Sequence, residues 1–267
     1  MFVPRPHPAR VVAVRRRSDA TTVVLDAPGW RSTGLADEWV HLWVPGPGGR
    51  SGGDGPRRLY SVVDVDPLTL ELAHHSPGPA GRWAGRAAAG HRVLVSQPAG
   101  RHRPPRDARW EVVVADHTGL PAARRIVAGS PPGRRLLLVL ETDDADVPAP
   151  EPAGATVVRV FRPDLAEPSA LAATVDGLEL PDGPGYLWLG AEVPAARAVR
   201  RRLRAAGWPP HRYAVSGYWQ RRDPGHADRY RAVADRVAAL YAEVETGVRD
   251  PEAVADDLDD LLDRHRL

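Results

Sequence analysis

One short segment in the first hundred residues combines side chains that can bind a flat, charged molecule. Arg58-Leu59-Tyr60-Ser61 opens a stretch with strand character. Because alternate side chains of a strand share a face, we expect Arg58 and Tyr60 to point one way and Ser61 the other. An arginine pairs with phosphate oxygens, and a tyrosine stacks on a heteroaromatic ring while its hydroxyl stays in water. An ordinary strand with one aromatic residue is the alternative that this segment alone leaves open.

A Gly/Pro-rich turn follows at 74–84, where the sequence HHSPGPAGRWA leads into a short expected helix. Backbone N–H groups at a helix start, flanked by small residues, form a cradle for phosphate. A solvated turn would have the same composition. His74 and His75 are adjacent, so on a strand they face opposite sides, and no third ligand lies at a suitable spacing. We therefore expect no metal site here.

Polar residues also follow two expected strands in the second half of the chain. The segment 116–122, DHTGLPA, links a buried-type strand to a helix, and Gly190-Ala191-Glu192 follows a later strand. Open α/β sheets bind ligands at the carboxyl ends of their strands, so both turns are candidates for a nucleotide site. Arginines also lie along one side of the next helix, where a solvated face is the alternative: Arg197, Arg200, Arg201 and Arg204.

The elements that must position these residues fall into two groups. In roughly the first hundred residues, six segments with β-branched or aromatic residues and Pro/Gly/Asp punctuation predict a small antiparallel barrel. These segments are 10–14, 21–25, 40–44, 58–65, 68–74 and 91–96. From residue 109, strands alternate with helices, which predicts a parallel sheet covered by helices. Its expected strands are 111–115, 135–141, 156–161, 186–190 and 213–219, and its helices are 121–128, 169–175 and 194–206, with Gly207 as a cap.

Beyond residue 224 the pattern is helical. Apolar residues at three-to-four spacing, among them Tyr230, Val233 and Val237, make one stripe, and Pro251 starts a second, acidic helix. Either the acidic helix packs its apolar stripe on the preceding domain, or it presents a surface to a partner.

Composition excludes several kinds of chemistry. The chain of 267 residues has no cysteine, so thiolate catalysis, disulfides and iron–sulfur clusters are excluded. All 36 basic residues are arginines, and the net charge of +2 divides into −4 for residues 248–267 and +6 for the rest. That positive charge suits small anionic ligands and is smaller than the charge expected of a nucleic-acid-binding protein.

The sequence has no apolar run long enough to span a membrane, no secretory signal and no heptad seam, so we expect a cytoplasmic monomer.

Taken in order, the motifs resemble those of the siderophore-interacting protein family, the FAD-dependent ferric-siderophore reductases of the ferredoxin-reductase-like superfamily. The order is an Arg-x-Tyr-Ser strand, a Gly-Pro-Ala…Trp turn, an Asp-x-Thr-x-Leu-Pro-Ala turn, a Gly-x-Glu turn and Gly217-Tyr218-Trp219. The resemblance implies an N-terminal antiparallel six-stranded FAD-binding barrel, a half-Rossmann parallel-sheet NAD(P)H-binding domain and a C-terminal helical extension. We place these parts at 1–105, 106–224 and 225–267.

The resemblance also implies site residues. Arg58 would contact the FAD phosphate, Tyr60 would stack on the isoalloxazine, and Ser61 would lie near the flavin N5. The residues implied to bind the cofactor are Arg58, Leu59, Tyr60, Ser61, His75, Gly78, Pro79, Ala80, Gly81, Trp83, Thr118, Pro121 and Trp219. Arginines stand where an anionic siderophore would need basic side chains: Arg101, Arg103, Arg221 and Arg222. No catalytic side chain is implied, because the flavin carries the chemistry.

Some positions depart from the family's pattern. Gly81 replaces a serine, His117 a glutamate and Gly119 an alanine, and Gly190-Ala191 reverses an Ala-Gly pair. The hydroxyl missing at Gly81 would weaken FAD binding by about one to two orders of magnitude, unless backbone N–H groups compensate.

The implied activity is transfer of electrons from NADPH, NADH or reduced ferredoxin through FAD to chelated Fe(III), which releases Fe(II). One alternative is a flavin reductase of the same fold with another electron acceptor. The other is a non-catalytic binding protein that has lost firm FAD binding.

Overall fold

The computed structural model describes residues 6–17, 20–45, 57–73, 79–144, 147, 150, 154–220, 225–245, 248–249, 251–265 and 267. The chain divides into two compact units, one ending at Trp219 and one beginning at Gln220.

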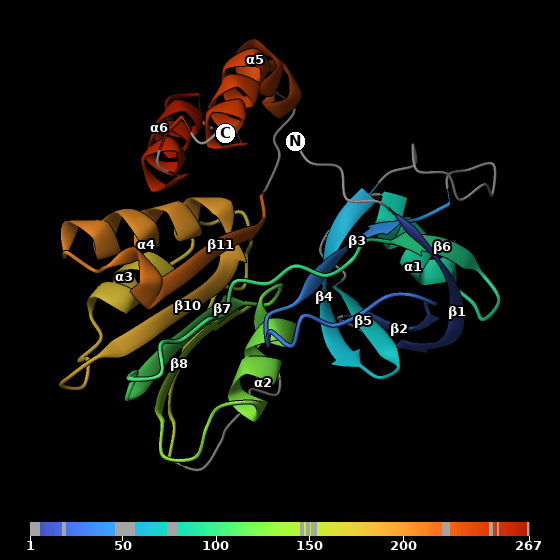
Figure 1. The fold of residues 1–267 in the computed structure, drawn as a ribbon, viewed down its shortest axis with the longest axis horizontal. Helices are drawn as coiled ribbons and strands as arrows, with labels where there is room; N and C mark the ends of the chain where they lie inside the picture. The colour runs from blue at the N-terminus through green and yellow to red at the C-terminus, as the bar shows by residue number, and fades with distance from the viewer. Residues whose placement is uncertain are drawn as a thin grey trace. The chain divides into compact units, whose positions relative to one another are not determined.

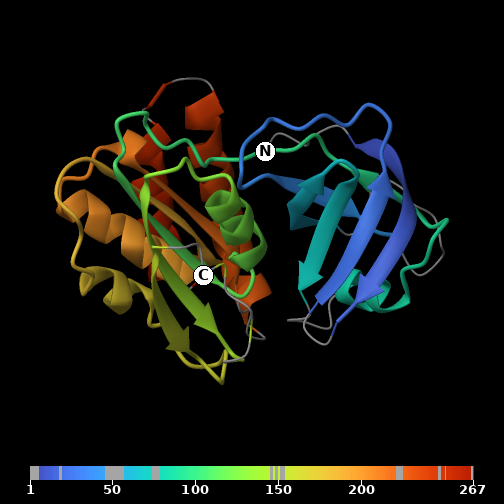
Figure 2. The same ribbon diagram turned by 90° about the horizontal axis from the view of Figure 1, so that it is seen from below.

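The first part of the larger unit is a closed six-stranded barrel (Figures 1 and 2). Its strands are β1 (His7–Arg16), β2 (Ala20–Asp26), β3 (Trp39–Trp43), β4 (Arg57–Val65), β5 (Leu68–Ala73) and β6 (Arg92–Val95). They are arranged in the order β1-β2-β5-β4-β3-β6, and every pairing is antiparallel. The predicted barrel is confirmed. Strand ends differ from the prediction by a few residues, and His74, expected to end a strand, lies outside the described residues.

The helix α1 (Pro79–Arg86) closes the core of the barrel. Ala80, Trp83 and Ala84 lie at the three-to-four spacing of one helix face, and all are buried in the cluster that the strands line. Trp83 is only 1% exposed. The indole therefore holds α1 against the barrel and fixes where its first turn begins.

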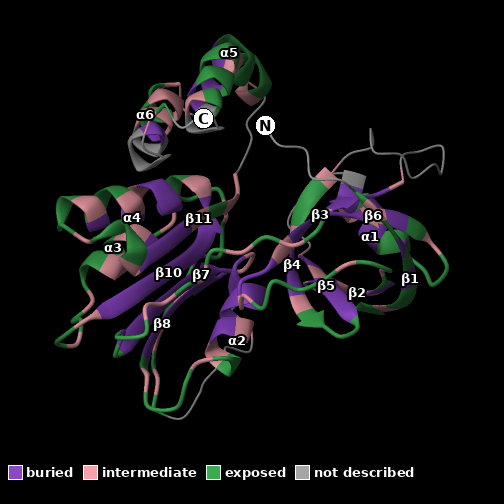
Figure 3. Cartoon of the chain, in the orientation of Figure 1, coloured by how far each residue is buried: buried purple, intermediate pink, exposed green. Residues whose placement is uncertain are grey.

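The second part of the larger unit is a five-stranded sheet in which every pairing is parallel. Its strands, in the order β11-β10-β7-β8-β9, are β7 (Trp110–Asp116), β8 (Arg135–Thr142), β9 (Thr156–Phe161), β10 (Gly185–Glu192) and β11 (Tyr213–Trp219). Every residue of β7 and β10 is buried, as a parallel strand covered on both faces requires (Figure 3).

Side chains of β7 alternate between the two faces of the sheet. Val112 and Val114 join the cluster that includes α3 (Leu171–Asp176) and α4 (Val193–Ala205). Val113 packs in the opposite cluster, with residues of α2 (Leu120–Ala128). Helices therefore cover both faces, and the carboxyl ends of all five strands meet at one edge, as the half-Rossmann prediction requires.

The end of α4 shows how closely local sequence determines a boundary. Gly207 has a φ of +75° and lies one residue beyond the cap residue, Ala206. The N–H of Gly207 donates to the carbonyl of Arg204 and that of Trp208 to the carbonyl of Leu203, each at 2.9 Å. This Schellman arrangement needs a left-handed residue, so glycine stops the helix where the sequence predicted.

The smaller unit contains α5 (His226–Glu245) and α6 (Pro251–Arg264). Val233 and Val237 of α5 are buried with Leu267, and residues of α6 pack against them, so the two apolar stripes cover each other. Tyr230, expected in the stripe, is 44% exposed because it lies a turn before the buried cluster starts. Among the described residues, no helix has the length and hydropathy needed to cross a membrane.

Candidate functional site

The strand β4 presents its candidate residues near the surface of the barrel. Arg58 and Leu59 are exposed, Tyr60 is half-buried and Ser61 is buried. Arg58 and Tyr60 pair with alternate residues of the neighbouring strand β3, so they share a face as predicted. The guanidinium of Arg58 bonds to the carbonyl of Arg57 at 2.8 Å and remains open to solvent. An anion can therefore approach it without breaking a salt bridge.

Tyr60 is suited to contact a flat ring. Its side chain packs against the barrel core, and burial raises the pKa of its hydroxyl to about 12, although the charge of Arg58 acts in the opposite direction. The phenol is therefore neutral at physiological pH. Leu59, its neighbour on the strand, is 47% exposed and lies on the opposite face of β4.

The first turn of α1 is suited to phosphate. It consists of Pro79, Ala80 and Gly81 followed by Arg82, and it contains no acidic residue. Small side chains and free N–H groups at a helix start attract an anion. With the open guanidinium of Arg58 and the neutral ring of Tyr60, these residues fit FAD. His75 and Gly78, also predicted to bind FAD, lie outside the described residues.

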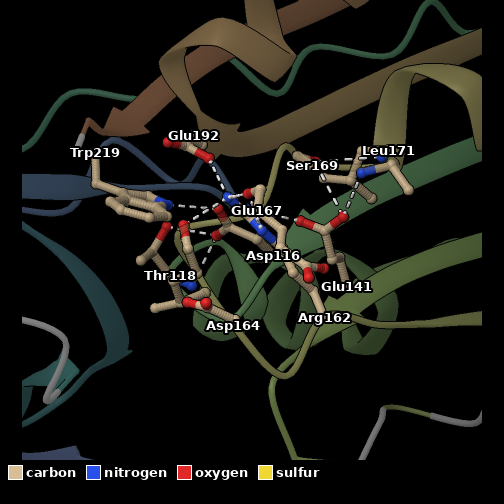
Figure 4. Close-up of polar contacts among 12 residues, drawn as sticks. Asp116, Thr118, Glu141, Arg162, Asp164, Glu167, Ser169, Leu171, Glu192 and Trp219 are labelled. Carbon is tan, nitrogen blue, oxygen red and sulfur yellow. Dashed lines mark hydrogen bonds and ion pairs between the residues drawn. The ribbon is translucent and has the colours of Figure 1, made fainter.

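The carboxyl end of β7 forms a hydrogen-bonded turn. Oδ1 of Asp116 accepts the backbone N–H of Thr118 at 2.8 Å and its hydroxyl at 2.6 Å, and Oδ2 accepts Nε1 of Trp219 at 2.6 Å (Figure 4). The structure thus brings Thr118 and Trp219 together through a shared carboxylate. The ring of Trp219 also lies 5.6 Å from that of His117. Pro121, another predicted site residue, is buried near the start of α2.

The structure gives a reason for glycine at position 119, where the family's pattern has alanine. A Cβ added at Gly119 would lie 1.9 Å from the carbonyl oxygen of Gly190, at the end of the adjacent strand β10. A Cβ at Gly190 would lie 2.7 Å from the ring of Trp188. Gly119 therefore lets the turn after β7 lie against the end of β10, which brings the two candidate nucleotide turns side by side, while Gly190 leaves room for the ring of Trp188.

A buried cluster of charges lies at the same edge, and the motif analysis missed two of its three members. Arg162, directly after β9, donates to Oε2 of Glu141 at 3.2 Å and to Oε2 of Glu192 at 2.9 Å (Figure 4). Its guanidinium also donates to the carbonyls of Leu165 and Glu167. The sequence signal was available, because Glu141 lies at the end of one strand and Arg162 directly follows another at a ligand-binding edge.

The cluster has a consequence for nucleotide binding. Arg162 is only 5% exposed and its N–H groups already donate hydrogen bonds, so it is poorly placed to receive a phosphate.

Three arginines of α4 are buried or hydrogen-bonded to the sheet. Arg197 is buried, Arg200 donates to the carbonyl of Val215 at 3.0 Å, and Nε of Arg204 donates to the hydroxyl of Tyr213 at 3.4 Å. The arginines of α4 thus do not form a simple solvated face.

The two described candidates for siderophore binding lie on the linker between barrel and sheet. Arg101 and Arg103 have exposed side chains and anchored backbones. The N–H of Arg101 donates to the buried carboxylate of Asp37 at 2.9 Å, and that of Arg103 donates to the hydroxyl of Tyr186 at 3.1 Å. Asp37 also accepts Nε1 of Trp188 at 2.9 Å. Arg221 and Arg222 lie outside the described residues.

Within the described ranges, no three His, Cys, Asp or Glu side chains lie together in a way that would hold a metal ion.

Two family models match the chain and together cover both parts of the larger unit. Residues 26–102 match the siderophore-interacting FAD-binding domain, and residues 108–222 match the siderophore-interacting protein. The chain belongs to the siderophore-interacting protein family. With an FAD-binding domain and the reductase fold, it is an FAD-dependent oxidoreductase, as the sequence predicted.

Individual relatives agree with this membership. An NADPH-dependent ferric-chelate reductase of Escherichia coli is 27% identical over 180 residues, which cover 62% of this chain and 68% of the relative. A siderophore utilization protein from T. fusca superposes with a TM-score of 0.69 at 28% identity, covering 83% of this chain and 95% of that one. A cytochrome P450 reductase from Amycolatopsis superposes with a TM-score of 0.59 at 25% identity, covering 81% of this chain and 70% of that one.

Proposed function

We propose that this protein is a ferric-siderophore reductase, which passes electrons from NADPH, NADH or reduced ferredoxin through FAD to chelated Fe(III) and releases Fe(II). The observation that carries the proposal is that one compact unit contains both a candidate flavin site and a candidate nucleotide site. The barrel offers an anion site and a neutral aromatic ring on β4, and the sheet offers the joined turns at 116–121 and 190–192. The names of the relatives support chelated iron as the acceptor.

Each group of residues has a distinct task in this proposal. Arg58 and the first turn of α1 bind the phosphates and the side chain of Tyr60 contacts the ring system, while Leu59 borders the cofactor from the other face of β4. FAD held by these residues would supply the hydride-accepting and single-electron chemistry. Asp116 holds the indole of Trp219 and the turn at Thr118 in fixed positions, which defines the place for the electron donor. No side chain needs to act as a nucleophile or a general base.

Capture of an anionic chelate is proposed for the exposed arginines of the linker. Arg101 and Arg103 have backbones fixed by Asp37 and Tyr186, so their side chains start from a rigid base. Fixed backbones lower the entropy lost when the side chains pair with a ligand. Arg221 and Arg222 are proposed for the same role on sequence grounds alone.

The test has two stages. The protein is incubated with excess FAD and desalted, and its visible spectrum is recorded; a retained flavin spectrum is expected. The loaded protein is then mixed anaerobically with a ferric siderophore and each electron donor in turn, with a colorimetric chelator to trap ferrous iron. Formation of ferrous iron with at least one donor is expected. A fully loaded protein that reduces no ferric siderophore with any donor would refute the proposal.

A different electron acceptor is the second candidate, and a sequence observation favours it. The chain contains no lysine and carries His117 in place of the family's glutamate, so the acceptor side departs from the pattern. Turnover with quinones or dyes, together with no reduction of ferric chelates, is the result that would select this alternative.

A further inference from the structure

Arg125 links the two parts of the larger unit through one guanidinium. It lies on α2, which begins directly after the turn at 116–119. One of its terminal nitrogens donates to the backbone carbonyl of Val62 at 3.0 Å. The other donates to Oε2 of Glu38 at 3.3 Å. Both acceptors belong to the barrel part of the chain, 63 and 87 residues away in sequence.

Glu38 is a fixed partner for this arginine. It is fully buried and its carboxylate also accepts the hydroxyl of Ser32 at 2.9 Å and that of Thr33 at 2.7 Å. The backbone N–H of Thr33 donates to the same carboxylate. With the carboxylate held from the barrel side, the guanidinium, which is 19% exposed, cannot move without breaking hydrogen bonds to a buried acceptor. Charge-assisted hydrogen bonds of this kind are directional.

The atoms that Arg125 joins lie next to the two proposed binding regions. Val62 directly follows Ser61 on β4, the strand proposed to contact the flavin. Arg125 lies just over one helical turn into α2, whose start is the turn proposed to face the electron donor. That turn cannot slide on the sheet, because Gly119 already lies against the carbonyl of Gly190. Arg125 therefore joins β4 directly to the helix that begins at the donor turn.

A second buried acid holds the barrel at a different point. Asp37, adjacent to Glu38, accepts the backbone N–H groups of Arg101 and His102 and the indole of Trp188. These contacts fix the linker and β10. Without Arg125 the barrel would therefore remain attached through the linker and through the pair of Arg124 with Glu71 of β5, and the contact that is lost is the one beside the flavin strand.

We propose that Arg125 and Glu38 are positioning residues that set the distance between the flavin strand and the donor turn, and so set the rate of hydride transfer. The inference rests on the proposed function, because it needs the flavin on the barrel and the nicotinamide on the sheet. A displacement of about 1 Å at a reacting pair can lower a rate by about a hundredfold. Neither residue contacts the reacting atoms, so both act through the placement of β4 and α2.

The variants are chosen so that a folding defect does not decide the result. Arg125→Lys keeps the positive charge but loses the planar guanidinium, whose two terminal nitrogens reach two acceptors at once. The pair Arg125→Met with Glu38→Gln removes both charges, so no buried charge is left unpaired. Arg124→Ala is the matched control: it is the adjacent residue on α2, and its pair with Glu71 of the barrel is longer, at 3.6 Å, with the arginine 32% exposed.

The distance itself is measured first, without any electron donor or siderophore. The chain has no cysteine, so Val12→Cys on β1 and Ala205→Cys on α4 give two unique, exposed positions for spin labels. Pulsed electron paramagnetic resonance should give a narrow distance distribution for the parent and for Arg124→Ala. A broadened or shifted distribution is expected for both Arg125 variants. An unchanged distribution in both would overturn the proposal, whatever the protein reduces.

The half-reactions are then measured separately by anaerobic stopped flow. Reduction of bound FAD by the nucleotide should slow at least tenfold in both Arg125 variants, and less than twofold in the Arg124→Ala control. Reoxidation of dithionite-reduced protein by a ferric siderophore should change less than threefold. Equal slowing of both half-reactions would indicate general damage and overturn the positioning role. If no nucleotide reduces the parent, the proposed nucleotide donor fails, and the distance distribution still decides the role of Arg125.

Discussion

At the scale of single residues, Tyr60 and Arg58 combine what a flavin site requires. The phenol ring packs against the barrel core, and the guanidinium two residues earlier remains in solvent. A buried hydroxyl resists ionisation, so the ring would stay neutral beside the negative phosphates of a cofactor bound in the proposed site. The site is therefore prepared before the cofactor arrives, which lowers the free energy lost to ordering on binding.

Stability above pH 10 should depend on Tyr60. Its pKa in the folded protein is about 12, against 10.0 for the ordinary side chain. Between these values the folded state holds a proton that the unfolded state has lost, so stability falls as pH rises through this window. Tyr60→Phe should remove this contribution and flatten the fall. The free energy of unfolding, measured by urea titration between pH 8 and about 12, tests this; parallel curves for parent and variant would contradict it.

At the scale of elements, the carboxyl edge of the sheet is held together by buried charge. Glu141, Arg162 and Glu192 join the ends of β8, β9 and β10. Oε1 of Glu141 also accepts the backbone N–H of Ala170, the residue directly before α3, at 2.8 Å. Parallel strands contact one another along their length, but their ends diverge into separate loops. One guanidinium shared by two carboxylates keeps those loops in register around the proposed nucleotide site.

Removing that guanidinium should destabilise the protein strongly. Arg162→Met leaves two buried carboxylates without a cation, and the expected loss is about 3–5 kcal/mol in the free energy of unfolding. Arg202→Met is the control, because its pair with Asp176 at 3.0 Å is exposed, with side chains 43% and 49% accessible. Exposed pairs contribute less than about 1 kcal/mol. Urea unfolding of both variants gives the comparison, and equal losses would show that the cluster has no special role.

At the scale of the whole molecule, the barrel and the sheet form one unit and the last two helices another. Among the residues that the structure describes, the three hydrophobic clusters of the larger unit contain none after Tyr218. The cluster of α5 and α6 is built from residues of those two helices and Leu267. The apolar stripe of α5 is thus covered by α6, so the two helices pack on each other within the extension.

A chain ending at Gln220 should therefore fold and bind FAD. Its melting temperature should change by less than about 5 °C, because the buried clusters of the larger unit remain complete. Differential scanning calorimetry and the flavin spectrum test this. Aggregation, or a fall of more than about 10 °C, would mean that α5 and α6 support the larger unit. A stable truncated protein that loses reduction by ferredoxin alone would favour the partner surface that the sequence left open.

The sequence by itself determined the order and type of the elements, because these depend on local periodicity and on local breakers. Strand residues alternate, helix residues recur at three-to-four spacing, and Gly207 ends α4 where a left-handed residue is required. The candidate strand at Arg58 and the turn at Asp116 could also be found, since each is a short contiguous motif. Family membership followed from the order of such motifs.

Only the tertiary structure decided how these parts hold one another. Glu38 and Arg125 are 87 residues apart, and Asp37 and Trp188 are 151 apart, so no local pattern signals either contact. The space around Gly119 is likewise set by a strand that follows about seventy residues later. Burial of a charge depends on which distant residues surround it, and that information exists only once the chain has folded.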